Sequence, residues 1–307
     1  MQILKPIIHE TVWGGVRLIP YAGLKTECEN IGHLYSVIDT PQRRSIFLNG
    51  PYKGKSIHDW FIENRDRYGL GHFKELPFIT ALVDATENLS IQVHPDDFVA
   101  RRLESKEFGK NESFFLIKAP TSGRMFNGTR VKTCYEFQCL IDQGRVLEGV
   151  DSIEVEEGDY VYVEGGTLHA ATEGSLSFEI EENCDLTYRI YDFDRLDKNG
   201  HSRPLQINQA LASLDPCLKS KVTKLKANSC LRERLYELTL VKGREAYICE
   251  GNMFAFVMLL HGMIEVDGVK IQPGTSVLME PDEVITLKGC TAMVSKPVPY
   301  KFENDKL

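Results

Sequence analysis

Several features that would indicate a particular partner or compartment are missing from the sequence. It contains no CxxC pair among its eight cysteines, no run of Lys and Arg, and no stretch of about 20 apolar residues of the kind that spans a membrane. Residues 1–6 also lack the charged start and the long apolar segment of a secretory signal. We therefore expect a cytoplasmic protein with reduced cysteines, and neither a nucleic acid nor a membrane as its partner.

The composition is that of an ordinary globular protein. Hydrophobic residues make up 42% of the chain and charged residues 26%, and the net charge of -8 disfavours binding to polyanions. A small molecule is therefore the expected ligand. At 307 residues, the chain is long enough for two domains of roughly 150 residues each.

Short apolar or alternating runs bounded by Gly, Pro or Asn predict an antiparallel, mainly β protein. In the first part of the chain these runs are residues 44–48, 90–93, 160–163 and 176–180. From about residue 231 only strand patterns follow, at residues 235–241, 255–260, 263–266, 277–279 and 284–287. This second group predicts a second, smaller β-barrel.

Helical spacing of apolar residues is confined to the first part of the chain. It covers residues 56–64, 95–106, 131–144 and 206–214. Pro95 suits the start of a helix, and Asp96 and Asp97 favour the positive end of the helix dipole. We expect one domain with a helical insertion over residues 1–215 and a second domain over residues 216–307.

A weak internal repeat distinguishes the two domains. Residues 156–170 and residues 271–285 each combine a Gly-containing turn, a short apolar strand and a polar turn. The first copy carries His169, whereas the second has no His at the matching place. If the protein has a metal site, only the first domain holds it.

Candidate metal ligands begin in the segment LSIQVHPDD, where strand alternation places Gln92 and His94 on one face. Together with Glu112 and His169 they would form a site of two His and one carboxylate, with Gln92 as an optional fourth donor, suited to a catalytic divalent metal. Each residue also has a simpler explanation: His94 as a core His bonded to backbone, Glu112 as a solvated side chain, and His169 as a turn cap. Sequence spacing alone leaves both readings open.

Four segments in this order resemble class I mannose-6-phosphate isomerases of the cupin superfamily, particularly the short bacterial form. They are LSIQVHPDD, GKNES, GGTLHA and NCDLTYRIYDFDR. VWGG and IGHLYSV are similar to the family's opening segment, so the motifs cover about residues 6–215. The resemblance implies two cupin-type (jelly-roll) β-barrels, with the helical insertion in the first barrel and no metal in the second.

The resemblance also implies which residues form the site. The family's zinc ligands fall on His94, Glu112 and His169, with Gln92 completing the site, which gives one Zn²⁺ per chain. Its catalytic and substrate-binding residues fall on Arg189, Asp185 and Lys110.

The activity implied by the resemblance is the interconversion of mannose 6-phosphate and fructose 6-phosphate through an enediol. A divalent metal would stabilise charge on the sugar oxygens, and a sugar phosphate would be the partner. Arg189 can bind the phosphate with two parallel hydrogen bonds while Lys110 supplies a point charge. Asp185, a metal-bound water or Lys110 could each move the proton, and we favour Asp185.

Three positions depart from the family pattern. His33 and Tyr35 stand where the family usually has a glutamate and a tryptophan, and Ala81 stands where it commonly has a lysine near the substrate. These changes keep a second hypothesis open, that of a non-catalytic or altered-specificity double cupin that binds a sugar phosphate. An iron oxygenase is a weaker alternative, because cupin oxygenases usually carry an HxH pair and Gln92 takes the first position here.

Overall fold

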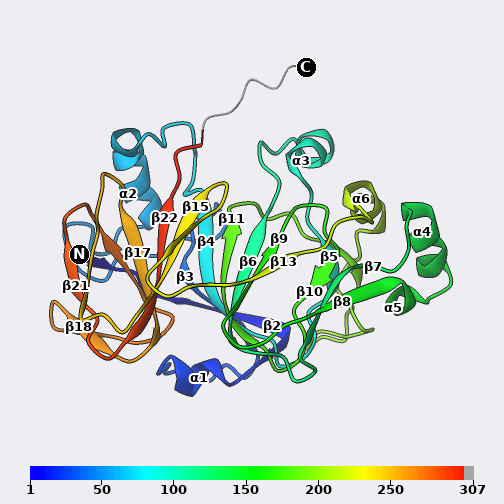
Figure 1. Ribbon diagram of the computed structural model, residues 1–307, viewed down its shortest axis with the longest axis horizontal. Coiled ribbons are helices and arrows are strands. Elements are labelled where there is room, and N and C mark those ends of the chain that lie inside the picture. Colours follow the sequence, from blue (N-terminus) through cyan, green and yellow to red (C-terminus); the bar gives the residue numbers. More distant parts are fainter. Residues whose placement is uncertain (301–307) are drawn as a thin grey trace.

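The protein is mainly β, and the computed structural model describes its residues 1–300 (Figure 1). The largest sheet has seven antiparallel strands in the order β13 (Lys221–Lys224), β9 (Asp159–Val163), β6 (Glu112–Lys118), β11 (Leu176–Glu182), β4 (Phe78–Asp84), β3 (Ile31–Val37) and β2 (Ile7–Gly15). This sheet lies between two others, so each of its faces is covered by a different part of the chain.

Two further sheets complete the main architecture. One has five strands in the order β12 (Tyr188–Tyr191), β5 (Ile91–Val93), β10 (His169–Ala170), β7 (Arg124–Thr129) and β8 (Val150–Glu154). The other has six, in the order β1 (Gln2–Ile3), β20 (Ser276–Met279), β17 (Ala255–His261), β22 (Thr291–Pro297), β15 (Tyr236–Lys242) and β14 (Cys230–Arg232). Two two-stranded sheets also lie in the C-terminal part: β16 (Ala246–Ile248) pairs with β21 (Val284–Thr286), and β18 (Ile264–Val266) pairs with β19 (Val269–Ile271).

Strand β4 illustrates why the seven-stranded sheet is central. All seven of its residues are buried, as expected for a strand covered on both faces. Leu82 joins the core shared with the six-stranded sheet, while Ala81 and Val83 join the core that faces the five-stranded sheet. Because successive side chains point to opposite faces, one strand contributes to both cores.

Aromatic contacts join the seven-stranded and six-stranded sheets. The Phe78 ring lies 6.1 Å from that of Tyr236 and 6.0 Å from that of Phe256, both edge-on. The Tyr236 hydroxyl and the Ser113 hydroxyl are 2.6 Å apart, and Ser113 is 2.7 Å from the Tyr160 hydroxyl. The buried phenol oxygens are thus hydrogen-bonded, so this polar contact lies within an otherwise apolar interface.

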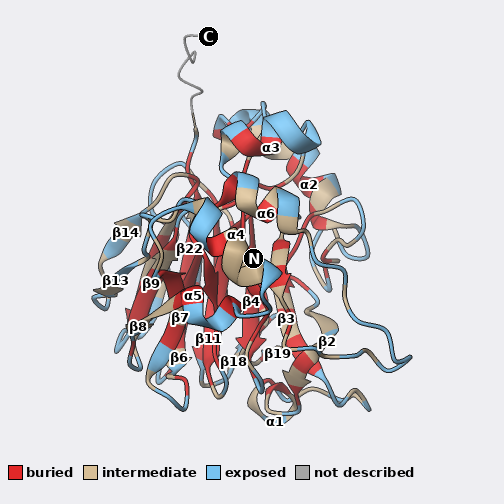
Figure 2. Cartoon of the chain, turned by 90° about the vertical axis from the view of Figure 1, so that its right-hand side faces the viewer, coloured by how far each residue is buried: buried red, intermediate tan, exposed pale blue. Residues whose placement is uncertain are grey.

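The predicted helices are present, each shorter than its sequence pattern. They are α2 (Ile57–Asn64), α3 (Asp97–Glu104), α4 (Cys134–Asp142) and α6 (Ile207–Ser213), joined by the short α1 (Leu18–Tyr21), η1 (Arg65–Tyr68) and α5 (Val146–Gly149). Ser56 and Asp59 form a capping box at the start of α2, and the Asp96 side chain accepts a hydrogen bond from the Val99 amide at the start of α3. The outer face of α3 is exposed, whereas the strands below it are buried (Figure 2).

One predicted strand is wrong. Residues 44–48 form only isolated bridges: Arg44 with Asp39, Ile46 with Ser56 and Phe47 with Leu4. The segment changes partner at nearly every step, so no ladder develops although its residues favour a strand. The other predicted strands are present within one or two residues of the expected ends.

Two short strands pair across the expected domain boundary. β1, at the start of the chain, pairs with β20, and β13, after residue 215, pairs with β9. The division into residues 1–215 and 216–307 therefore stays a prediction, and residues 301–307 lie outside the described part. Within residues 1–300 no helix is both long and apolar enough to cross a membrane.

Arg234 ties the C-terminal strands to the first part of the chain. Its Nε donates to Glu182 Oε1 at 2.8 Å, its Nη1 donates to Asp97 Oδ2 at 2.7 Å, and its Nη2 donates to Glu182 Oε2. Glu182 is buried at the end of β11, so its carboxylate depends on this guanidinium for most of its compensation.

Replacing Arg234 should therefore destabilise the protein. We expect Arg234→Ala to lower the free energy of unfolding by roughly 3 kcal/mol, the lower end of the cost of breaking a buried ion pair, because 24% of the Arg234 side chain is exposed. The control is Arg232→Ala, which removes a surface pair with Glu237 and should cost about 0–1 kcal/mol. Equilibrium urea unfolding measures both variants, and equal losses would contradict this role for Arg234.

Candidate active site

Three predicted metal ligands converge from three strands. His94 follows β5, Glu112 begins β6 and His169 begins β10, and all three side chains are buried. His94 Nε2 lies 3.0 Å from Glu112 Oε2, and His169 Nε2 lies 2.8 Å from Glu112 Oε1. The structure thus brings together residues that are 75 positions apart in the sequence.

The other ring nitrogens fix the tautomers of both imidazoles. His94 Nδ1 is 2.8 Å from the Leu186 carbonyl oxygen, and His169 Nδ1 is 2.9 Å from the Thr167 carbonyl oxygen. A carbonyl only accepts, so each Nδ1 carries the hydrogen and donates it. In the neutral ring, each Nε2 then presents a lone pair toward Glu112.

This arrangement of acceptors favours a cation between them. The two Nε2 atoms and Glu112 Oε1 are buried and have no hydrogen-bond partner within the described residues. Burial, followed by the charge of Lys110, lowers the pKa of His94 to about 4, so its ring is neutral near pH 7. Lone pairs facing a carboxylate repel one another unless a metal ion lies between them, and backbone-anchored Nδ1 atoms are typical of metal-binding His. The residues present therefore fit a divalent metal.

Gln92 lies beside this cluster on the same face of its sheet. It stands directly opposite His169 on one side and Arg189 on the other. Directly opposite residues in an antiparallel ladder point to the same face, so the three side chains form a row. The Ser90 hydroxyl donates to Gln92 Oε1 at 3.1 Å and orients the amide.

A cavity of about 460 Å³ opens above the cluster. Gln92 and Glu112 line it beside the buried His94 and His169, and Arg189, Arg203, His33 and Tyr35 also line it. Its volume is within the range of small-molecule sites. The predicted residues Lys110 and Asp185 also line this cavity, so it contains every predicted site residue except the buried His94 and His169.

Lys110 is held by carboxylates within the cavity. Its ammonium pairs with Glu181 and lies 3.3 Å from Glu112 Oε2. Burial alone would lower the pKa of Lys110, but Glu181, Glu112 and Glu179 together raise it above its ordinary value. Lys110 therefore remains a cation and is unsuited to accept a proton.

Glu179 and Glu181 are site residues that the sequence analysis missed. Both are buried, and burial, followed by neighbouring carboxylates for Glu179, raises the pKa of each above its ordinary value. They alternate with Phe178 and Ile180 along β11, so both acidic side chains point to the same side as Glu112. That alternation within LSFEIEE was the signal that could have identified them.

His33 and Tyr35 form a neutral aromatic wall with His9. The rings of His33 and Tyr35 are parallel with centroids 5.2 Å apart, and His9 lies 6.0 Å from Tyr35. Burial lowers the pKa of His33 to about 3 and that of His9 to about 4. His33 Nε2 lies 3.6 Å from Glu179 Oε2. Position 33, where the sequence analysis noted that the family usually has a glutamate, thus carries an uncharged ring that faces the Glu179 carboxylate.

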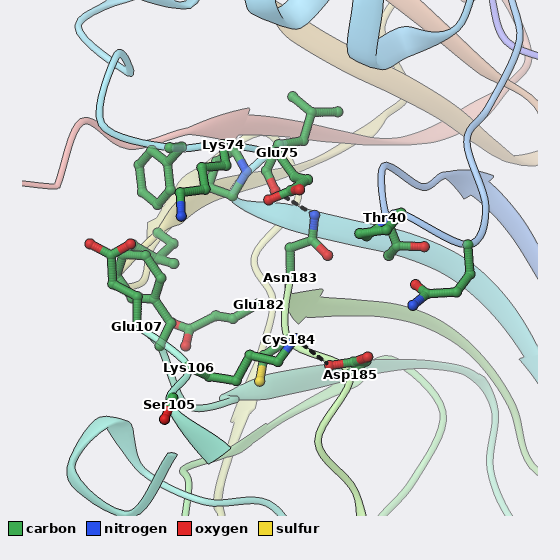
Figure 3. A pocket seen from close by; sticks show the side chains of 17 residues that line it. Thr40, Lys74, Glu75, Ser105, Lys106, Glu107, Glu182, Asn183, Cys184 and Asp185 are labelled. Carbon is green, nitrogen blue, oxygen red and sulfur yellow. Dashed lines mark hydrogen bonds and ion pairs between the residues drawn. The ribbon is translucent and has the colours of Figure 1, made fainter. Parts of the chain in front are cut away.

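Asp185 lies at the rim of the cavity rather than at its floor. About 55% of its side chain is exposed, and its Oδ1 lies 3.4 Å from Lys106 Nζ. Figure 3 shows Asp185 at the edge of a neighbouring pocket of about 320 Å³, which shares Thr40, Gln42, Cys184 and Asp185 with the cavity above the metal ligands. The carboxylate therefore borders both spaces.

Comparison with known proteins places this chain among phosphomannose isomerases. The family described as phosphomannose isomerase type I, catalytic domain, matches residues 1–112. The putative mannose-6-phosphate isomerase YvyI of Bacillus subtilis is 36% identical over 68% of this chain and 66% of its own length. Mannose-6-phosphate isomerase ManA of the same organism is 31% identical over 69% of this chain and 67% of its own length.

A solved structure extends the likeness over nearly the whole fold. The mannose 6-phosphate isomerase from Bacillus subtilis superposes with a TM-score of 0.78 at 29% identity, covering 96% of this chain and 98% of that one. The alignments to YvyI and ManA each span about two thirds of the relative's length. On its sequence, its fold and the set of residues in its cavity, this chain belongs to the class I (type I) phosphomannose isomerase family.

Proposed function

We propose that the protein is a metal-dependent aldose-ketose isomerase that interconverts mannose 6-phosphate and fructose 6-phosphate. The observation that carries this proposal is the meeting of two imidazole lone pairs with Glu112 Oε1, none of which has a hydrogen-bond donor among the described residues, beneath a cavity that Arg189 and Arg203 also line. The family and the similarity to mannose-6-phosphate isomerases support the choice of substrate. We further propose that the two parts of the fold are cupin-type barrels and that the second holds no metal.

We propose one Zn²⁺ per chain, held by His94, Glu112 and His169 with Gln92 as the fourth protein ligand. Two nitrogen donors and a carboxylate are a ligand set typical of catalytic zinc. Bound there, the ion would stabilise negative charge on the sugar oxygens during enolisation. The other carboxylate cluster, Glu112 with Glu179 and Glu181, already contains the Lys110 ammonium, which supports a single site per chain.

The side chains around the metal ligands would divide the remaining tasks. Arg189 would bind the phosphate, because its long side chain extends from the position next to Gln92 into the cavity. Lys110 would supply a fixed positive charge near the reacting oxygens, and its raised pKa excludes it as the base. Asp185 would move the proton between C1 and C2, because its carboxylate borders the cavity and its only ion pair within residues 1–300 is with Lys106.

The proposal is tested first by turnover. We expect zinc-loaded protein to convert mannose 6-phosphate to fructose 6-phosphate in a coupled assay, and a chelator to abolish this activity until zinc is restored. Chelator-resistant turnover would contradict the role of the metal. A protein that binds zinc but shows no turnover would instead support the non-catalytic alternative.

Mutations should distinguish the role of the proposed metal ligands from that of the proposed phosphate ligand. His94→Ala should lose both bound zinc and turnover, with activity reduced roughly a thousandfold or more, because the metal accounts for several kcal/mol of transition-state stabilisation. Arg189→Ala is the matched control, because it removes the proposed phosphate ligand and leaves the proposed metal ligands in place: it should retain zinc and raise KM about tenfold or more. Metal analysis and steady-state kinetics check both, and an active His94→Ala protein without metal would refute the mechanism.

Asp185 can be tested against its own ion-pair partner. Asp185→Asn should retain zinc and lower kcat about a hundredfold or more, because the amide cannot accept the carbon-bound proton. Lys106→Gln removes the same ion pair but keeps the carboxylate, so it should stay within a few fold of the unmodified protein. Kinetics together with exchange of solvent deuterium into the sugar distinguish the two, and equal effects would exclude Asp185 as the base.

A further inference from the structure

The cavity contains four cations, and they differ in how far their charge is already compensated. Lys110 is committed to Glu181 and Glu112 at the floor. Arg43 lies over the Tyr35 ring at 6.0 Å, on the side of the aromatic wall. The remaining two, Arg189 and Arg203, belong to another part of the lining.

Arg189 has no direct carboxylate partner among residues 1–300, and Asp192 compensates its charge only from a distance. Its Nε is buried and has no hydrogen-bond partner, and within residues 1–300 no ion pair joins its guanidinium to a carboxylate. Burial, followed by the charge of Arg203, lowers the pKa of Arg189, as expected for two neighbouring guanidinium groups. An arginine in this position needs an anion.

Arg203 is held in place with one amino group left over. Its Nε donates to Asp192 Oδ2 at 2.7 Å and its Nη2 donates to Asp192 Oδ1 at 2.6 Å. Its Nη1 makes no hydrogen bond within the described chain. The bidentate pair with Asp192 fixes the orientation of the Arg203 guanidinium, so its Nη1 group is already positioned before any ligand binds.

The local charge favours a dianion. Asp192 is shared by Arg203 and Arg195, whose Nη2 lies 2.6 Å from Asp192 Oδ1. Two guanidiniums thus share one buried carboxylate with Arg189 nearby, and the exposed Glu87, 3.6 Å from Arg195, is the only other acid paired with these arginines among residues 1–300. The arginines therefore keep a net positive charge on the cavity side.

We propose that Arg203 is a second phosphate-binding residue, which together with Arg189 binds the phosphate of the sugar substrate. This inference rests on the proposed function for the identity of the substrate. Ala81 on β4 is uncharged, so this strand brings no positive charge to the cavity. Arg203, in the segment after β12, supplies one instead. Arg–phosphate pairs form two parallel hydrogen bonds, and the two guanidiniums offer enough free donors for them.

The spacing of the strands agrees with this arrangement. His169, Gln92 and Arg189 are opposite one another on three adjacent strands, β10, β5 and β12. Adjacent strands lie about 4.8 Å apart, so the backbone of Arg189 is about 10 Å from that of His169. A hexose phosphate can extend along such a row, with its first carbons near the metal ligands and its phosphate near the two arginines.

Binding of inorganic phosphate, measured by calorimetry on zinc-loaded protein, tests the proposal independently of turnover. We expect Arg203→Gln to raise the Kd for phosphate about tenfold or more, and to raise KM for mannose 6-phosphate by a similar factor with kcat changed much less. Arg203→Lys should recover part of the affinity, because it restores the positive charge but not the two parallel hydrogen-bond donors of a guanidinium. Thermal unfolding confirms that the variants fold.

The control is Arg195→Gln, which removes the other guanidinium from Asp192 without changing a residue that lines the cavity. Its phosphate affinity should remain within a few fold of the unmodified protein. Unchanged phosphate binding by Arg203→Gln would overturn the proposal, as would equal losses in both variants, since the effect would then act through Asp192. Absence of turnover in the unmodified protein would refute the proposed function alone, because the phosphate titration still decides the role of Arg203.

Discussion

Charge balance in the buried floor of the cavity is the constraint on which the site depends. Glu112, Glu179 and Glu181 would carry three negative charges when ionised, and Lys110 supplies one positive charge among them. A divalent cation at His94, Glu112 and His169 would supply the other two. Burial raises the pKa of Glu179 and Glu181, which limits the cost of placing several carboxylates together.

The fold makes this concentration of charge possible. The seven-stranded sheet is covered on both faces, so its acidic side chains lie on the face toward the cavity while Phe178 and Ile180 of the same strand pack against the six-stranded sheet. The apolar core on one face therefore stabilises a strand whose other face is polar. The C-terminal strands therefore have a structural role, because they cover the apolar face of the sheet that carries Glu112.

The chemistry of the cavity changes from one end to the other. The proposed metal ligands and Lys110 lie at the floor, the arginines lie beyond Gln92, and a neutral wall of His33 and Tyr35 stands on the other side. A ligand with hydroxyl groups at one end and a dianion at the other matches this gradient. The uncharged His33 is the clearest departure from the family pattern, and it changes the surroundings of Glu179 rather than the metal ligands.

The sequence by itself predicted the candidate metal ligands, the four main helices and most strands. Alternation placed Gln92 and His94 on one face, and apolar spacing predicted the starts of α2 and α3 to within two residues. These features depend on local periodicity and on hydrogen bonds between near neighbours, which a sequence records directly. The strand prediction for residues 44–48 was wrong for the opposite reason, because the bridges of this segment depend on other segments of the chain.

Only the tertiary structure decided which other side chains share the cavity. Glu179 and Glu181 face Glu112 because β11 pairs with β6, and Arg203 faces Arg189 because Asp192 holds it there. No spacing rule relates these residues, since strand order and register arise from packing the whole sheet. The sequence thus specified the candidate metal ligands and much of the local structure, whereas the fold determined the electrostatic environment around them.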